Sequence, residues 1–130
     1  MFKITPVQDK ETAKKYLDIT AAVAKENAFV YAMLDCESGD LMGISQFEIM
    51  KDEGYISDLK PRIGYSDFEA MFILGRATMN FIDLCGPHKC RASITAGDER
   101  LMKSIGFRVE GEDYFTDMTG MFDGDCSSKK

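Results

Sequence analysis

Residues 66–87 read SDFEAMFILGRATMNFIDLCGP and predict one long helix that is apolar on almost every side. Ser66 and Glu69 match the S-x-x-E capping box, in which two side chains satisfy backbone amides at a helix start. Gly86 suits the left-handed position that follows a helix, and Pro87 cannot continue one. Between these signals, three charged side chains interrupt the apolar surface, at Glu69, Arg76 and Asp83. We expect such a helix to be the most buried element of the domain.

The residues before this helix predict one amphipathic helix and four strands. Asp9 is a suitable N-cap, and apolar residues follow it at intervals of three and four until about Asn27. This helix is expected to cover one face of a sheet. Short polar turns separate the later apolar segments and indicate an antiparallel meander. The predicted strands are residues 2–7, 28–34, 41–50 and 55–59, with Gly43 as a candidate bulge.

The residues after the long helix complete a mixed sheet. His88 to Thr95 alternates in polarity and predicts a half-buried strand, adjacent and parallel to residues 55–59 through a right-handed crossover. Asp98 caps a short helix that Gly106 ends, and residues 107–110 and 114–118 form a last hairpin. The fold class is therefore α/β (mixed α+β), with six to seven strands, a buried central helix and helices on both faces. One domain is expected over residues 1–123, followed by a flexible tail at residues 124–130.

Composition and charge exclude several classes of protein. The 130 residues are 45% hydrophobic and contain no apolar run of about 18 residues that could cross a membrane. Residues 1–8 have no apolar segment behind a basic start, so no secretory signal is expected. The net charge is −6, and the two halves of the chain carry equal numbers of basic residues. Without a basic region, nucleic acid is not expected as a partner.

The cysteines give no metal motif. Cys36, Cys85, Cys90 and Cys126 form no C-x-x-C pair, which favours reduced thiols and a cytoplasmic protein. The only histidine, His88, lies between Cys85 and Cys90, but no fourth ligand follows at zinc-finger spacing. We interpret this segment as a helix end, a turn and a strand start, and expect no metal. Six acidic residues between 110 and 125 form either a solvated face or an attraction for a cationic amine.

The order of elements resembles that of the GNAT superfamily of N-acetyltransferases. The best local match is DERLMKSIGF (residues 98–107), a short helix that ends in a Gly-Phe pair. The resemblance covers essentially the whole chain, although one helix precedes the meander where the family usually has two. It implies the GNAT fold and acetyl-CoA as the co-substrate.

The family's cofactor loop, Q/R-x-x-G-x-G/A, would correspond to residues 60–67, KPRIGYSD. The resemblance implies that Leu59, Arg62, Ile63, Gly64, Tyr65 and Ser66 contact acetyl-CoA. Gly64 comes one residue early, and Asp67 adds a carboxylate where a phosphate would bind. Two interpretations stay open: a cofactor loop in which Arg62 adds compensating charge, and an ordinary capped helix.

The catalytic candidates also follow from the resemblance. An amine attacks the thioester after a base removes its proton, and Glu48 and Asp58 lie on the strands beside the expected acyl site. The family's proton-donating tyrosine corresponds to Met102, which has no proton to donate. Water or Tyr114 could take its place.

Two functions from different classes follow. The first is a cytoplasmic N-acyltransferase that transfers an acetyl group from acetyl-CoA to an amine of a small molecule or peptide. The alternative is a GNAT-like module without catalysis that serves in ligand binding or dimerisation. Neither involves nucleic acid or a membrane, and a homodimer is the assembly considered.

Overall fold

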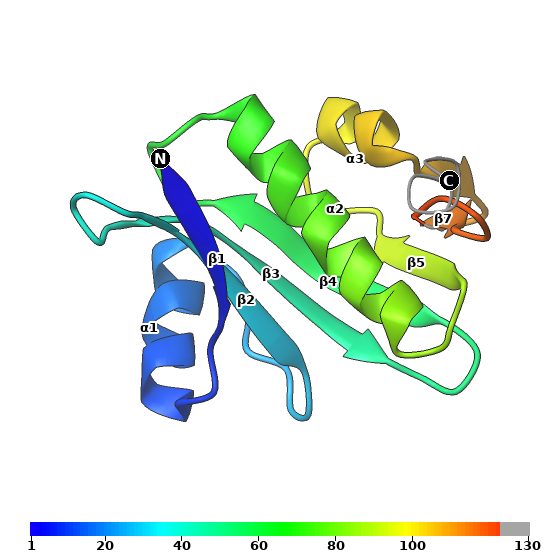
Figure 1. Ribbon diagram of the computed structural model, residues 1–130, viewed down its shortest axis with the longest axis horizontal. Coiled ribbons are helices and arrows are strands. Elements are labelled where there is room, and N and C mark those ends of the chain that lie inside the picture. The colour runs from blue at the N-terminus through cyan, green and yellow to red at the C-terminus, as the bar shows by residue number, and fades with distance from the viewer. Residues whose placement is uncertain (123–130) are drawn as a thin grey trace, which may run out of the picture.

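A computed structural model describes residues 1–122 of the chain and contains one seven-stranded sheet (Figure 1). The strand order is β1-β2-β3-β4-β5-β7-β6. Neighbouring strands are antiparallel except β4 and β5, which are parallel as predicted. The strands are β1 (Phe2–Pro6), β2 (Phe29–Asp35), β3 (Leu41–Ile49), β4 (Gly54–Pro61), β5 (Lys89–Ser93), β6 (Arg108–Glu110) and β7 (Asp113–Asp117). The expected tail at residues 124–130 lies outside the described residues.

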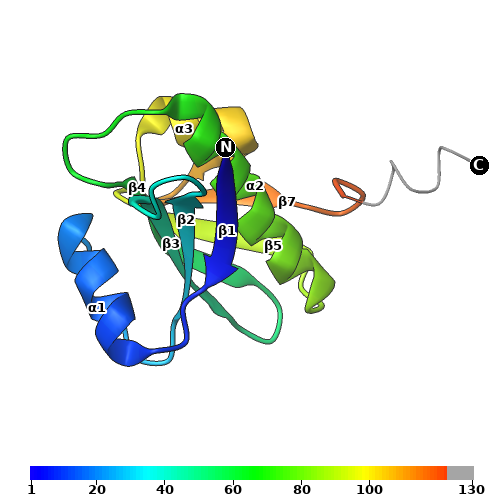
Figure 2. The same cartoon turned by 60° about the vertical axis from the view of Figure 1, so that its left-hand side comes forward.

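Helices cover both faces of the sheet, which confirms the predicted fold class. Figure 2 shows α1 (Lys10–Ile19) on one side of the sheet and α2 (Phe68–Leu84) on the other. The short α3 (Glu99–Ile105) lies beside α2. One buried cluster lies between the sheet and these two helices, and a smaller one lies between the sheet and α1. Within residues 1–122, no helix combines the length and the apolar character that a membrane crossing needs.

The start of α2 differs from the prediction. Its N-cap is Asp67, whose side chain accepts the amide of Ala70 at 3.1 Å. The predicted capping box of Ser66 and Glu69 is therefore wrong by one position. Asp67 has extended backbone angles, with φ −149° and ψ 95°, which set its carboxylate over the first turn. Ser66 is thereby left in the preceding loop.

The expectation that α2 is the most buried element is also wrong. Leu84 is 75% exposed and Ile73 is 37% exposed, so one side of the helix faces solvent. In contrast, β3 has seven consecutive buried residues, from Leu41 to Phe47. A central strand is covered on both faces, whereas a helix on the outside of a sheet can bury only one stripe.

The first helix is shorter than predicted. It ends at Ile19 rather than near Asn27, with Thr20 as C-cap, and Ala21 follows with a φ of +60°. The hydroxyl of Thr20 bonds the carbonyls of the last turn, and the chain then leaves the helix as a loop. Other element bounds lie within about two residues of the prediction, which is the usual uncertainty of helix and strand ends.

The parallel strands β4 and β5 separate towards one end. They pair from Gly54 opposite Cys90 to Ile56 opposite Ala92, and no further. A register shift between β3 and β4 leaves Ser57 as an extra residue just where the strands part. Past this point the Leu59 amide donates to the carbonyl of Ala96 at 2.7 Å, in the loop after β5. The separation opens a space on both sides of β4.

Candidate active site

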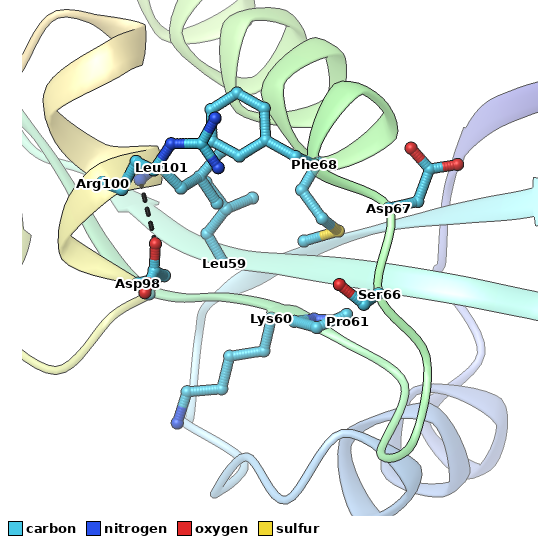
Figure 3. Close-up of a pocket in the computed structure, with 11 residues that line it drawn as sticks. Leu59, Lys60, Pro61, Ser66, Asp67, Phe68, Asp98, Arg100 and Leu101 are labelled. Carbon is cyan, nitrogen blue, oxygen red and sulfur yellow. Dashed lines mark hydrogen bonds between the residues drawn. The ribbon is translucent and has the colours of Figure 1, made fainter.

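The larger of two spaces beside β4 is here called the splay pocket. It has a volume of about 460 Å³ and lies between the end of β4, the start of α2 and the start of α3 (Figure 3). Its lining residues are Leu59, Lys60, Pro61, Ser66, Asp67, Phe68, Met71, Gly97, Asp98, Arg100 and Leu101. The predicted cofactor residues Leu59 and Ser66 thus lie in one pocket.

Backbone amides at the start of α2 give the splay pocket an anion-binding edge. The amides of Ser66, Asp67 and Phe68 have no acceptor within residues 1–122. They precede a helix of 17 residues, whose dipole places partial positive charge at this end. Free amides and a helix N-terminus together favour a bound phosphate group.

Both carboxylates that line the splay pocket are engaged as helix caps. Asp98 caps α3 and accepts the amide of Leu101 at 3.3 Å. Asp67 accepts the amide of Ala70 and, at 3.3 Å, the hydroxyl of Tyr65. Figure 3 shows the Asp67 carboxylate turned away from the other labelled side chains. The repulsion of phosphate expected from Asp67 is therefore weakened, because the carboxylate is held by its two donors and faces away.

The arginine in the lining of the splay pocket is Arg100 rather than Arg62. The Arg100 guanidinium lies over the ring of Phe68, 4.2 Å from its centroid, in the lining of the pocket. Arg62 lies outside that lining, 5.5 Å from the centroid of the Tyr65 ring. Sequence analysis missed Arg100, because only the packing of α3 against α2 brings it to the pocket.

The remaining loop residues predicted to contact acetyl-CoA lie in the loop from β4 to α2, outside the pocket lining. Ile63 is 67% exposed, and Gly64 has a φ of +85°, a backbone conformation that favours glycine. Partial burial and the adjacent Asp67 carboxylate raise the pKa of Tyr65, so its phenol stays protonated and donates to Asp67. These residues shape the loop, and none of them lines the splay pocket.

A second, smaller pocket lies on the α1 side of β4 and is here called the α1-side pocket. Its volume is about 220 Å³, and its lining residues are Ala21, Val23, Lys25, Tyr55, Ser57, Asp58, Lys60, Ser93 and Thr95. Asp58 is only 6% exposed, and one of its oxygens accepts the side-chain amide of Gln46 at 2.7 Å. The other lies 3.4 Å from the Lys60 ammonium.

Gln46, which sequence analysis also missed, connects Asp58 to the loop after α1 through its side-chain hydrogen bonds. Its side-chain amide donates to Asp58 and, at 3.0 Å, to the carbonyl of Val23. Its side-chain oxygen accepts the amide of Lys25 at 2.8 Å. One buried side chain thus orients a carboxylate and fastens the loop after α1 to the sheet.

The other catalytic candidates lie outside both pockets. Glu48 is on β3, where it pairs with Tyr55 of β4, and it lines neither pocket. Tyr114 is 3% exposed and packs on Phe107 in the core, with 6.3 Å between ring centroids. Met102 is fully buried in the same core. Among the three predicted catalytic residues, the structure brings only Asp58 to a cavity.

The side chains of Cys85, His88 and Cys90 lie in three different environments. Cys90 is buried, which raises the pKa of its thiol to about 12, whereas Cys85 is exposed. The His88 ring lies 2.5 Å from the Asp83 carboxylate. Within residues 1–122 no group of three such side chains is arranged to hold a metal ion.

Gly97 allows the loop after β5 to approach β4, and its replacement by Ala is expected to destabilise the protein by about 1–3 kcal/mol. A Cβ at this position would lie 2.8 Å from the backbone oxygen of Leu59, which cannot move without shifting the strand. Urea unfolding measures the change in stability. A loss below about 0.5 kcal/mol would show that the loop is not held tightly against β4.

The fold has close counterparts among solved structures. No family model matches the chain, and no curated protein matches it in sequence. The ribosomal-protein-S18-alanine N-acetyltransferase from Escherichia coli is similar with a TM-score of 0.71 and 12% identity, over 91% of this chain and 94% of that one. The PaiA N-acetyltransferase from Thermoplasma acidophilum, in complex with coenzyme A, gives 0.68 and 13% over 90% and 99%. A GNAT family acetyltransferase from Elizabethkingia anophelis with acetyl-CoA bound gives 0.61 and 14% over 85% and 78%. At such low identity the likeness establishes the fold, and this chain has a divergent form of the GNAT N-acetyltransferase fold.

Proposed function

We propose that the protein is an N-acetyltransferase that moves an acetyl group from acetyl-CoA to a primary amine. The observation that carries the proposal is the pair of pockets on the two sides of β4, at the point where β4 and β5 separate. One has free helix amides and an arginine, and the other has a buried carboxylate. Two of the similar structures contain CoA or acetyl-CoA, which supports the same co-substrate here.

The splay pocket would hold the co-substrate. The anionic phosphates of acetyl-CoA would bind the amides of Ser66, Asp67 and Phe68, and Arg100 would supply the compensating charge. The apolar side chains of Leu59 and Met71 would cover the less polar part of the ligand. Acetyl-CoA supplies an acetyl thioester, which an amine can attack directly.

Asp58 would act as the base on the other side of β4. Successive side chains of a strand point to opposite faces, so Leu59 lines the splay pocket and Asp58 lines the α1-side pocket. The acetyl group would therefore have to reach Asp58 through the gap beside Ser57 and Ser93, where β4 and β5 no longer pair. The amine loses one proton to Asp58, and its nitrogen forms a bond to the acetyl carbon as the carbon–sulfur bond breaks. The sulfur leaves as a thiolate and takes a proton from water, since Met102 and Tyr114 lie in the core.

One observation favours the non-catalytic alternative. The Leu59 amide, the strand donor between the pockets, is already bonded to the carbonyl of Ala96 and is not free to hold the carbonyl oxygen of an acetyl group.

The proposed acetyl transfer is tested by incubation with acetyl-CoA and a panel of amines, with the acetylated product measured by mass spectrometry. We expect turnover with at least one amine. Tight CoA binding without any turnover would favour the ligand-binding module, and no CoA binding at millimolar concentration would overturn the proposed function.

Arg100→Ala is expected to weaken CoA binding about tenfold, because it removes the cation that faces the splay pocket. Arg62→Ala is the matched control and is expected to change affinity by less than about threefold, since Arg62 lies over Tyr65 outside the lining. Calorimetric titration of both variants measures the difference. Equal losses, or a larger loss for Arg62→Ala, would place the phosphates on the 62–65 loop instead.

A further inference from the structure

The α1-side pocket carries charges of both signs, and this inference about its ligand rests on the proposed function. Asp58 is more than nine-tenths buried and lies at the wall formed by β4. The Lys60 ammonium is 3.4 Å from it, and Lys25 lines the same pocket from the loop after α1. The Asp58 carboxylate and the Lys60 ammonium therefore border a space of about 220 Å³, and Lys25 is a second lysine among its lining residues.

The charged end of the Lys60 side chain lies at the α1-side pocket. Lys60 also lines the splay pocket, but Figure 3 shows its side chain extending away from Phe68 and Arg100. The ammonium ends beside Asp58, and the ion pair is largely shielded, with the two side chains 30% and 9% exposed. A ligand with only a cationic amine would meet Asp58 but would be repelled by Lys60 and Lys25.

The wider α1 face also favours an anionic group. A neighbouring cavity of about 480 Å³ lies on the other side of the loop after α1 and shares Lys25 with the α1-side pocket. Together the two cavities are lined by four lysines and two acids, Lys10, Lys14, Lys25, Lys60, Glu26 and Asp58. Lys14 lies 4.0 Å from Asp18, so the excess of positive charge in the lining comes from the other three lysines. The chain as a whole has a net charge of −6. The acidic residues of β6 and β7 that could attract a cation line neither cavity.

We propose that the acceptor is a small zwitterionic amine of the amino-acid type, which carries a carboxylate close to the primary amine. The amine would face Asp58, and the carboxylate would face the ammonium of Lys60, with Lys25 as the second lysine of the lining. The hydroxyls of Ser57, Ser93 and Thr95 complete a polar lining that suits such a molecule. A peptide N-terminus lacks the adjacent carboxylate, so it would bring no negative charge to the side of the pocket that the lysines line.

The experiment compares amino acids with their own carboxamides. Glycine, alanine, serine and lysine, and the four corresponding amides, are supplied with acetyl-CoA, and kcat/KM is measured by mass spectrometry of the product. A thiol dye is avoided because Cys36 and Cys85 are exposed. The amine of a carboxamide is the more readily deprotonated, so intrinsic reactivity favours the amide. We expect at least one amino acid to be acetylated tenfold or more faster than its amide.

Variants separate this inference from the proposed function. Lys60→Met is expected to bring the acid-to-amide ratio close to one, and Lys25→Met to reduce it several-fold. Lys3→Met, on β1 at the edge of the sheet, should leave the ratio unchanged. Amides acetylated as fast as the acids, or a ratio insensitive to Lys60, would overturn the inference while the acetyltransferase function stands. No acetylation of any amine, with no CoA binding, would overturn both.

Discussion

Asp58→Asn is expected to lower kcat for acetyl transfer by about 10²- to 10³-fold, the usual contribution of a positioned general base. The amide keeps the size of the carboxylate and can still accept a hydrogen bond from Gln46, so the pocket should keep its shape. It cannot accept the proton of the amine. Steady-state kinetics with saturating acetyl-CoA measures the loss, and calorimetry with CoA checks that cofactor binding is retained.

Glu48→Gln is the matched control for this experiment. Glu48 is also a strand carboxylate that sequence analysis proposed as base, but it lines neither pocket. Its replacement is expected to change kcat by less than about threefold, since a group outside the site transfers no proton. A larger loss for Glu48→Gln than for Asp58→Asn would move the base to β3 and contradict the assignment.

Gln46→Leu is expected to destabilise the fold by about 2–3 kcal/mol, because three groups lose their hydrogen-bond partner at once. The side chain is 1% exposed, and its partners are the Asp58 carboxylate, the Val23 carbonyl and the Lys25 amide. Urea unfolding measures the loss. Hydrogen exchange should also rise in residues 21–28, because the loop loses its attachment to β3.

Ser45→Ala provides the comparison for Gln46→Leu. Ser45 is the preceding residue, is fully buried on the α2 side, and makes one side-chain hydrogen bond, at 2.8 Å to Thr78. Its loss is expected to cost about 1 kcal/mol and to leave exchange in residues 21–28 unchanged. Equal losses for the two variants would show that Gln46 does not fasten the loop.

The fold was predictable because it depends on local patterns. Apolar spacing, turn residues and the Gly-Phe stop at residues 106–107 each act over a few positions, and they predict the meander and the last hairpin. The pairing of β7 with β5 joins distant segments and was not predicted. The start of α2 was less certain, since Ser66 and Asp67 are adjacent and both suit an N-cap. Only the backbone angles of Asp67 decide between them.

The site was harder to predict because its residues meet across long separations. The partners of Gln46 lie 12, 21 and 23 positions away, and a polar residue on a strand gives no sign of them. Arg100 reaches Phe68 only through the packing of α3 beside α2. Asp58 could be proposed from the family resemblance, but its choice over Glu48 depends on which strand borders the cavity.

The most direct test of the central proposal, that the splay pocket binds CoA, is a CoA titration followed in amide-resolved NMR spectra. We expect saturable shifts concentrated at the amides of Ser66, Asp67 and Phe68, with a further shift at the Arg100 side chain. These three amides have no acceptor within residues 1–122, and Arg100 is the arginine in the lining of the same pocket. No shift at millimolar CoA, or shifts confined to the α1 face, would contradict this account.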